Sequence, residues 1–303
     1  MNELYRPTEI MSPGQMSCPG CGLALGMRQV MRAMGRHCVV VVVPSCVAVT
    51  TGPYPNYTLG VPAFHSAFEI AAPTAAGIRN ALIQQGKEDI PVLAFAGDGG
   101  TFDIGLQSLS GCADRNEDII YVCMDNEAYM NTGIQVSSAT PEFTWTGTSP
   151  SGNTRRKKKI MEIMAAHRMP YAATASPAYP EDLTRKIQKA KALRGTRFIH
   201  ILAPCNTGWK IKEDMAVRVA LLSVETNVFP LYEIEDGLTY TINYQSRNLS
   251  VERYLEVQGR YRHVTPEQTD LIQAEVDRNW EELSARAERS RRVMRDGKRA
   301  RSA

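Results

Sequence analysis

The sequence predicts an α/β fold with a mainly parallel sheet flanked by helices. Short apolar runs at 38–46, 90–96, 119–124 and 198–203 are bounded by turn-forming residues, as is typical of strands buried on both faces of a sheet. Segments with helical spacing of apolar residues alternate with these runs, at 23–34, 70–85, 158–167 and 179–193. This alternation is the rhythm of parallel strands joined by crossover helices.

The composition is that of an ordinary globular protein. Of 303 residues, 43% are hydrophobic and 22% are charged, and no apolar run reaches the roughly 18 residues of a membrane span. The start of the chain lacks the basic and apolar pattern of a secretory signal, so we expect a cytoplasmic location and no membrane contact. The net charge of +3 and the spread of the basic residues give no reason to expect nucleic acid as a partner.

A change in character near residue 230 suggests two parts. Residues 1–230 contain the alternating strands and helices and are expected to form one domain, and residues 231–303 a C-terminal extension with a charged helix and a basic tail. That helix should begin at the capping box of residues 265–268. Its apolar stripe at positions 272, 276 and 280 should dock onto the body or a partner, and the basic residues beyond Arg289 should form a frayed tail.

Two predicted strand ends carry residues suited to a Mg²⁺-diphosphate site. One apolar run is followed by Gly97, Asp98 and Gly99, and the next run by Asn126. Glycines allow close approach of a bulky anion, while carboxylate and amide oxygens are hard ligands of the kind that Mg²⁺ selects. A Gly-Asp-Gly tripeptide alone is typical of an ordinary turn, so the prediction depends on the second strand end.

Seven cysteines in a chain of this class favour metal ligation or buried thiols over disulfides. Cys18 and Cys21 form a Cys-x-x-Cys pair on a Pro-Gly turn, Cys46 ends the valine-rich run, and Cys205 follows the run at 198–203. Such a set suits a redox pair, a structural Cys₄ zinc site or an iron-sulfur cluster. The other three lie in or beside apolar segments and are expected to be buried: Cys38, Cys112 and Cys123.

The spacing of Asp98 and Asn126 resembles the thiamine-diphosphate motif. In that family the aspartate, the asparagine and a backbone carbonyl two residues later hold Mg²⁺ on the diphosphate, which implies Asp98, Asn126 and Ala128 here. The following segment, 129–141, resembles the β subunit of pyruvate and other 2-oxoacid:ferredoxin oxidoreductases, a similarity that covers about residues 10–285. The resemblance implies a thiamine-diphosphate-binding fold of the pyrophosphate-binding type.

The same resemblance selects among the cysteine alternatives. Family members carry a Cys-x-x-Cys pair, a third cysteine at this distance and a distant fourth, and these four hold the [4Fe-4S] cluster nearest the thiamine. The implied ligands here are Cys18, Cys21, Cys46 and Cys205.

Further site residues follow from the family segments. The candidate catalytic residues are His65 and Asn131. His65 precedes a helix in a segment that lies over the thiamine diphosphate in relatives, although such a histidine is also typical of a structural residue. Asn131 and Thr132 are expected to reach the thiazolium side of the cofactor, with a hydrogen-bonded turn as the alternative. Glu69 is expected to cap or pair with the start of a helix. The basic run 155–159 suits a solvated helix start, or a contact to phosphate, CoA or acidic ferredoxin.

The implied activity is oxidative decarboxylation of a 2-oxoacid with one-electron transfer to the cluster. Pyruvate with CoA is favoured, and oxalate, 2-oxoisovalerate and an aryl glyoxylate are the alternatives. The resemblance also implies a pyrimidine-binding α subunit that supplies the activating glutamate and the substrate arginine, a ferredoxin-like γ/δ subunit, ferredoxin as acceptor, and a dimer of heteromers. The rival hypothesis is a non-redox thiamine-diphosphate decarboxylase subunit with a structural Cys₄ zinc.

Overall fold

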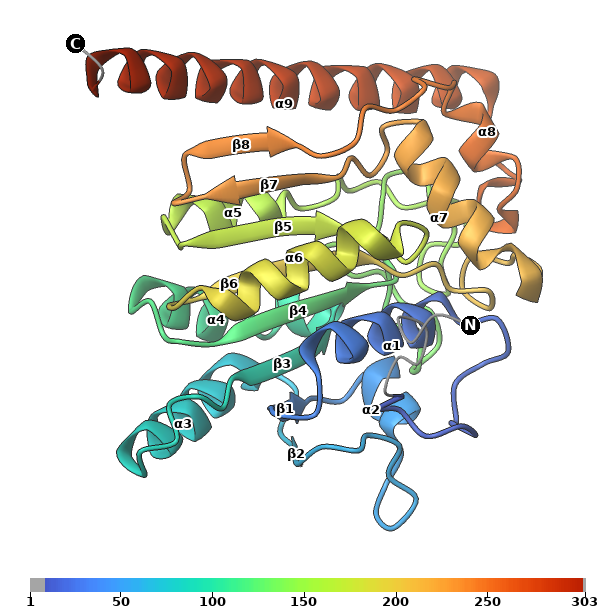
Figure 1. Cartoon of the computed structure of the whole chain (residues 1–303). Coiled ribbons are helices and arrows are strands. Elements are labelled where there is room, and N and C mark those ends of the chain that lie inside the picture. The colour runs from blue at the N-terminus through green and yellow to red at the C-terminus, as the bar shows by residue number, and fades with distance from the viewer. Residues whose placement is uncertain (1–8, 302–303) are drawn as a thin grey trace, which may run out of the picture.

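An eight-stranded sheet forms the centre of the protein, whose computed structural model describes residues 9–301 (Figure 1). The spatial order of the strands is β2-β1-β3-β4-β6-β5-β7-β8. The first six in that order are mutually parallel, and β7 and β8 continue the sheet antiparallel. The strands are β1 (Val39–Val42), β2 (Ala63–His65), β3 (Val92–Gly97), β4 (Ile120–Asp125), β5 (Tyr171–Ala175), β6 (Arg197–Leu202), β7 (Tyr232–Glu235) and β8 (Thr239–Ile242).

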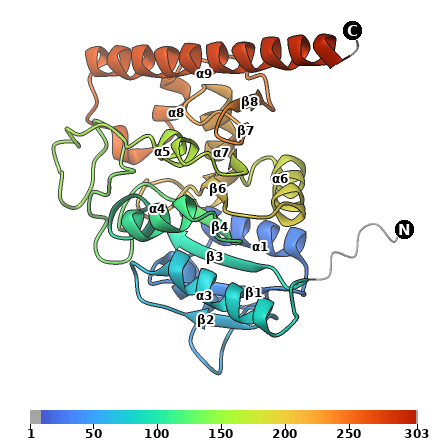
Figure 2. The same cartoon turned by 90° about the vertical axis from the view of Figure 1, so that its left-hand side faces the viewer.

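Helices cover both faces of the sheet (Figure 2). One face carries α1 (Gly22–Met34) and α6 (Pro180–Ala192), and the other carries α3 (Ala71–Gln84), α4 (Leu106–Asp114) and α5 (Ile160–Ala166). Alternate residues of each strand therefore enter two different cores: in β1, Val41 packs in one core and Val40 in the other. Burial on both faces explains why the parallel strands are almost entirely apolar.

The remaining helical elements lie around the carboxyl edge of the sheet and its C-terminal end. They are α2 (Cys46–Thr51), η2 (Gly99–Asp103), η3 (Glu213–Met215), α7 (Ala216–Glu225), α8 (Glu252–Leu255), η4 (Gly259–Tyr261) and α9 (Pro266–Arg301). A third apolar core, which includes Trp209, Val219 and Tyr254, joins α7 and α8 to the start of α9.

Helix α9 runs along β8 at the end of the sheet (Figure 1). The predicted apolar stripe docks onto the body, because Val276 is buried and Ile272 and Trp280 pack against the apolar cores. The expected frayed tail is wrong for the described residues, since α9 continues to Arg301.

The predicted α/β class and the four main apolar strands are confirmed. Sequence patterns did not reveal β2, which has three residues, or the β7-β8 hairpin, whose strands alternate polar and apolar residues. The predicted boundary at 230/231 falls just before β7 and stays a prediction, although β7 and β8 belong to the same sheet as the first part. None of the helices within residues 9–301 has the length and apolar character needed to cross a membrane.

Candidate functional site

Strands β3 and β4 bring the predicted metal ligands together. They are parallel neighbours in which Gly97 pairs with Met124, so the residues that follow each strand meet at the same edge of the sheet. Asp98 comes directly after β3, and Asn126 comes directly after β4. In open α/β sheets this carboxyl edge is the usual place for a ligand.

Three oxygen atoms converge at this edge. The side-chain oxygen of Asn126 lies 3.0 Å from Asp98 Oδ1 and 3.0 Å from the carbonyl oxygen of Ala128. Three acceptors at this separation repel unless a cation lies among them. Adjacent oxygens of an octahedral Mg²⁺ site with bonds of about 2.1 Å are about 3.0 Å apart. The donor set and its spacing therefore fit Mg²⁺, and the predicted trio of Asp98, Asn126 and Ala128 is brought together.

The carboxyl group of Asp98 lacks a cationic side chain in direct contact among residues 9–295. It is buried, and it accepts a hydrogen bond from Ser137. Burial and the negative charge of Asp125 raise its pKa well above the usual range of an aspartate. A bound cation would offset both effects and hold the carboxyl group ionised.

The glycines of the Gly-Asp-Gly-Gly segment are needed for close packing and not for unusual backbone angles. None of Gly97, Gly99 and Gly100 has a positive φ angle. A Cβ atom on Gly99 would lie 2.2 Å from the ring of Tyr129, and one on Gly100 would lie 3.1 Å from the ring of Phe68. Tyr129 follows the Ala128 carbonyl directly, so the absence of a side chain at Gly99 lets the two limbs of the site pack together.

A cavity of about 210 Å³ opens over the three oxygens. Both limbs of the predicted site line it, together with Leu23 of α1 and the start of α2: Pro44, Ser45, Cys46, Phe68, Gly97 to Gly100, Asn126, and Ala128 to Thr132. Asn131 and Thr132 lie in its exposed rim. The hydroxyl of Thr132 donates to the side chain of Gln135 (2.7 Å). Thr132 therefore also takes part in a hydrogen-bonded turn, which was the alternative role expected from the sequence.

His65 and Glu69 lie outside this cavity. His65 is the last residue of β2, exposed, with Nε2 3.5 Å from the hydroxyl of Thr51. Glu69 precedes the N-cap of α3, and its side chain caps no helix and forms no ion pair within the described part of the chain. Its backbone carbonyl accepts a hydrogen bond from Ser108 instead. The capping role expected for Glu69 is therefore wrong.

The four predicted cluster cysteines come from separate elements at the same edge. Cys21 is the N-cap of α1, and Cys46 is the first residue of α2, not the end of a strand as the sequence suggested. The turn that carries Cys18 is tied to the segment after β6 by a hydrogen bond from Asn206 to Pro19 (2.7 Å), and Cys205 lies in that segment. The other three cysteines, Cys38, Cys112 and Cys123, are buried as predicted.

Each of the four sulfur atoms receives a hydrogen-bond donor. The donors are Thr207 Oγ1 to Cys18 (3.9 Å), the Ala24 amide to Cys21 (3.4 Å), Asn126 Nδ2 to Cys46 (3.6 Å) and the Gly208 amide to Cys205 (3.3 Å). Such donors offset the negative charge of metal-bound thiolates. Within residues 9–295 no three His, Cys, Asp or Glu side chains are grouped tightly enough to hold one metal ion.

Comparison with known proteins identifies the family. A family model described as the C-terminal TPP-binding domain of thiamine pyrophosphate enzymes matches residues 44–201. The chain is 47% identical over 281 residues to the pyruvate synthase subunit PorB of Methanothermobacter thermautotrophicus, covering 91% of this chain and 97% of that protein. It is 44% identical over 288 residues to the ketoisovalerate oxidoreductase subunit VorB of Pyrococcus abyssi, covering 91% and 92%.

This chain belongs to the thiamine-pyrophosphate-binding β subunits of the 2-oxoacid:ferredoxin oxidoreductases. A solved structure, of the 2-oxoglutarate:ferredoxin oxidoreductase from Magnetococcus marinus, has the same fold. Its TM-score is 0.57 with 21% identity, over 72% of this chain and 81% of that one. The predicted family, fold and enzyme class are thus confirmed, and thiamine diphosphate is its cofactor. As its relatives' names indicate, the β subunit is part of a multi-subunit enzyme.

We call residues 125–129, which contain the predicted ligands Asn126 and Ala128, the metal loop. A buried network of charged side chains that was not predicted from the sequence lies next to it. Asp125 and Glu127 flank Asn126, and their carboxylates pair with basic side chains. Lys157 Nζ contacts Asp125 Oδ2 at 2.7 Å and Glu127 Oε1 at 2.8 Å, and Arg260 contacts Glu127 Oε2 at 2.7 Å. His200 Nε2 lies 2.8 Å from Asp125 Oδ2. Burial alone would raise the pKa of Asp125, but Lys157 and His200 outweigh it and hold that pKa below its usual range.

The network also fixes the backbone of the metal loop. Arg260 stacks 3.7 Å over the ring of Trp209, whose indole Nε1 donates to the carbonyl of Asn126 at 2.8 Å. Glu127 has a φ of 67°, a strained conformation that these contacts hold in place. The available signal was the pair of acidic residues on either side of Asn126, at the end of a buried apolar strand.

The basic run 155–159 is divided among several roles. Arg155, Arg156 and Lys159 are exposed, whereas Lys157 belongs to the buried network. The prediction of a solvated helix start is therefore wrong for Lys157, and α5 begins only at Ile160. The local sequence could not indicate the buried contacts of Lys157, because its partners lie 30 and 32 positions earlier in the chain.

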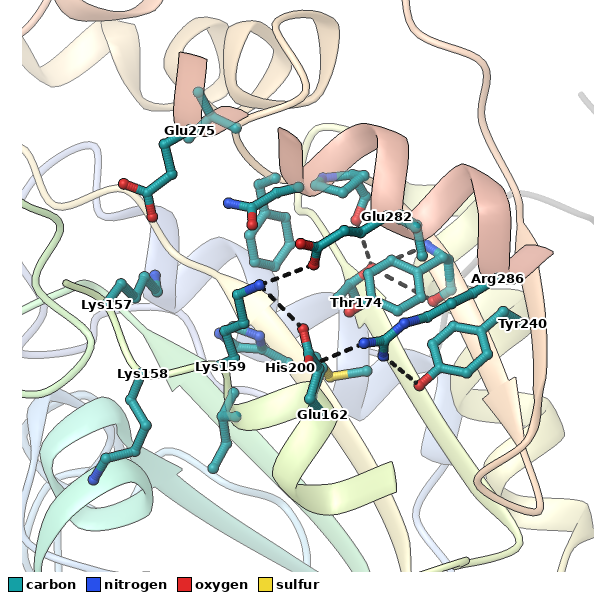
Figure 3. A pocket seen from close by; sticks show the side chains of 18 residues that line it. Lys157, Lys158, Lys159, Glu162, Thr174, His200, Tyr240, Glu275, Glu282 and Arg286 are labelled. Carbon is teal, nitrogen blue, oxygen red and sulfur yellow. Dashed lines mark hydrogen bonds and ion pairs between the residues drawn. The ribbon is translucent and has the colours of Figure 1, made fainter. Parts of the chain in front are cut away.

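A second cavity, of about 200 Å³, lies between α5, β8 and α9, and Lys157 and His200 of this network line it (Figure 3). Its charged residues largely pair with each other: Lys159 contacts Glu162 and Glu282, and Arg286 contacts Glu162 and the hydroxyl of Tyr240. His200 borders it, and burial lowers the pKa of this histidine despite the nearby Asp125.

Proposed function

We propose that this β subunit holds Mg²⁺-thiamine diphosphate through Asp98, Asn126 and the carbonyl of Ala128. The observation that carries the proposal is the convergence of three oxygens at 3.0 Å beneath a cavity on the carboxyl edge of the sheet. We further propose that the chain holds a [4Fe-4S] cluster, which the hydrogen-bond donor at each sulfur supports. Its ligands would be Cys18, Cys21, Cys46 and Cys205.

The reaction proposed is oxidative decarboxylation of a 2-oxoacid with CoA. The acid loses CO₂, its acyl carbon is joined to the sulfur of CoA, and two electrons leave one at a time for ferredoxin, with release of one proton. Bound thiamine diphosphate supplies an acceptor for the electron pair that remains when CO₂ departs. The chain's own contribution is to orient the diphosphate with Asp98 and to border the reacting end with Asn131 and Thr132.

Pyruvate is the proposed substrate. Two supports are the local sequence similarity to pyruvate-type chains and the relative named pyruvate synthase at 47% identity. The relative named ketoisovalerate oxidoreductase, at 44% identity, makes 2-oxoisovalerate the first competitor. Oxalate and an aryl glyoxylate are the remaining members of a test panel.

The enzyme is proposed to need further subunits. An α subunit would bind the aminopyrimidine of the cofactor and supply the activating glutamate and the substrate arginine. A ferredoxin-like γ/δ subunit would carry electrons onward to ferredoxin, within a dimer of heteromers. The free state of all seven cysteines within residues 9–301 suits a reducing compartment, in keeping with a cytoplasmic location.

Two experiments test this function. Steady-state kinetics of the reconstituted complex on the four 2-oxoacids, with a low-potential dye as acceptor, should give the highest kcat/KM for pyruvate. Titration of the α subunit into this chain without oxygen should produce activity only after the partner is added. Full activity of the isolated chain would overturn the proposed division of labour. Zinc in place of iron and acid-labile sulfide would overturn the cluster.

A further inference from the structure

The amide group of Asn126 touches both proposed cofactor sites. Its oxygen faces Asp98 Oδ1 and the Ala128 carbonyl, each at 3.0 Å, and its nitrogen lies 3.6 Å from the sulfur of Cys46. The amide is planar and rigid, so one rotation about its final bond sets both contacts at once. When the oxygen points to the metal position, the N–H group necessarily points to the sulfur.

The two possible orientations suit two different states. If no cation is present, the reversed amide donates hydrogen bonds to Asp98 Oδ1 and to the Ala128 carbonyl, both at 3.0 Å. If a cation is present, its positive charge requires the oxygen on that side. The occupant of the metal position therefore selects which amide atom faces Cys46.

The hydrogen bonding of the Cys46 sulfur, which depends on whether it carries a proton, also connects the two sites. As a thiol it donates a hydrogen bond to Asn131 Oδ1 at 3.0 Å. Ligation to iron removes that proton, and the sulfur then becomes an acceptor. Asn126 is the side-chain donor that the described part of the chain places against it.

We propose that Asn126 couples the two sites: metal binding turns its amide so that Nδ2–H donates to the cluster-ligating sulfur of Cys46. This inference rests on the proposed function, since it takes Mg²⁺ and an iron-sulfur cluster as the two occupants. A donor to a ligating sulfur stabilises the reduced, more negative cluster, so it raises the reduction potential. Filling the thiamine site would therefore make its first electron acceptor easier to reduce. By linkage, reduction of the cluster would tighten metal binding.

The decisive variant is Asn126→Thr in the complete complex, because threonine keeps an oxygen for the metal and lacks the N–H donor. Its O–H group ends one bond closer to the backbone than Nδ2, which already lies 3.6 Å from the sulfur, so it does not replace that donor. With Mg²⁺ and thiamine diphosphate saturating, an EPR-monitored redox titration should give a more negative midpoint potential for the Cys46-ligated cluster than in the wild type. Asn126→Ala should show the same shift and should also lose thiamine diphosphate. A wild-type potential in both variants would overturn the inference.

A thermodynamic cycle separates coupling from a local effect of the substitution. Removing Mg²⁺ and thiamine diphosphate from the wild-type complex should lower the potential by more than the same treatment lowers it in Asn126→Thr. Equal shifts would show that the cofactor acts on the cluster by charge alone and would overturn the link. Failure of the proposed function looks different: the wild-type complex would then lack iron bound through Cys46, with Cys46→Ala keeping its full iron content.

Discussion

Substitution of Gly99 by alanine tests the packing of the metal loop. The new Cβ would lie 2.2 Å from Cε1 of Tyr129, where carbon atoms in contact are normally about 3.5 to 4.0 Å apart. The ring must therefore move by more than about 1 Å. It cannot do so freely, because its hydroxyl donates to Asp103 at 2.8 Å and its backbone N–H donates to Gln135 at 2.9 Å. Its neighbour Ala128 supplies the carbonyl at the metal position and should move with it.

The expected cost follows from the size of this overlap. Overpacking of this kind costs about 1 to 3 kcal/mol, and each 1.4 kcal/mol is a factor of ten in affinity. Gly99→Ala should therefore weaken thiamine diphosphate binding by roughly five-fold to a hundred-fold in calorimetric titration of the complex. The matched control is Gly77→Ala in α3, where no atom lies within 4 Å of the new Cβ and helix propensity favours alanine by up to about 1 kcal/mol. Unchanged affinity in Gly99→Ala would refute the reasoning.

Three further substitutions test other parts of the account. Asp98→Ala removes the charged metal ligand and should abolish retention of thiamine diphosphate while the iron content stays at the wild-type level; full cofactor content would exclude Asp98 as a ligand. Cys205→Ala should bleach the broad iron-sulfur absorbance or convert a four-iron EPR signal, whereas buried Cys112→Ala should do neither; equal spectra would refute the four-cysteine scheme. Arg260→Met leaves Glu127 buried with one cation fewer and should lower the free energy of unfolding by about 3 to 5 kcal/mol in denaturant titration, a loss that a surface ion pair would not give.

Local patterns of apolar residues in the sequence were sufficient to predict the four main strands and the positions of Asp98 and Asn126 at their ends. The runs that became β3 and β4 are wholly buried, and burial on both faces leaves a continuous apolar sequence that is easy to recognise. Because both strands end at the same edge, the positions of Asp98 and Asn126 followed from the strand assignment. The position of a residue next to a strand end follows from the position of the strand, whereas the proposed role of these residues as metal ligands came from the family resemblance.

The buried charged network next to the metal loop could not be predicted from such local patterns. Lys157 looks like part of a solvated basic run, and only the fold brings it to Asp125 and Glu127. Arg260 lies 133 positions from its partner Glu127. The β7-β8 hairpin escaped notice because it closes the end of the sheet with mixed polar strands. Contacts between distant segments leave no periodic signal in the chain, so pattern analysis alone cannot find them.

A crystal structure of the complete complex with thiamine diphosphate and Mn²⁺ in place of Mg²⁺ tests the central claim most directly. Anomalous scattering would locate manganese and iron separately. We expect a manganese peak among Asp98, Asn126 and the Ala128 carbonyl, and an iron peak enclosed by the four cysteines Cys18, Cys21, Cys46 and Cys205. A manganese peak elsewhere, or no iron peak at these cysteines, would contradict it.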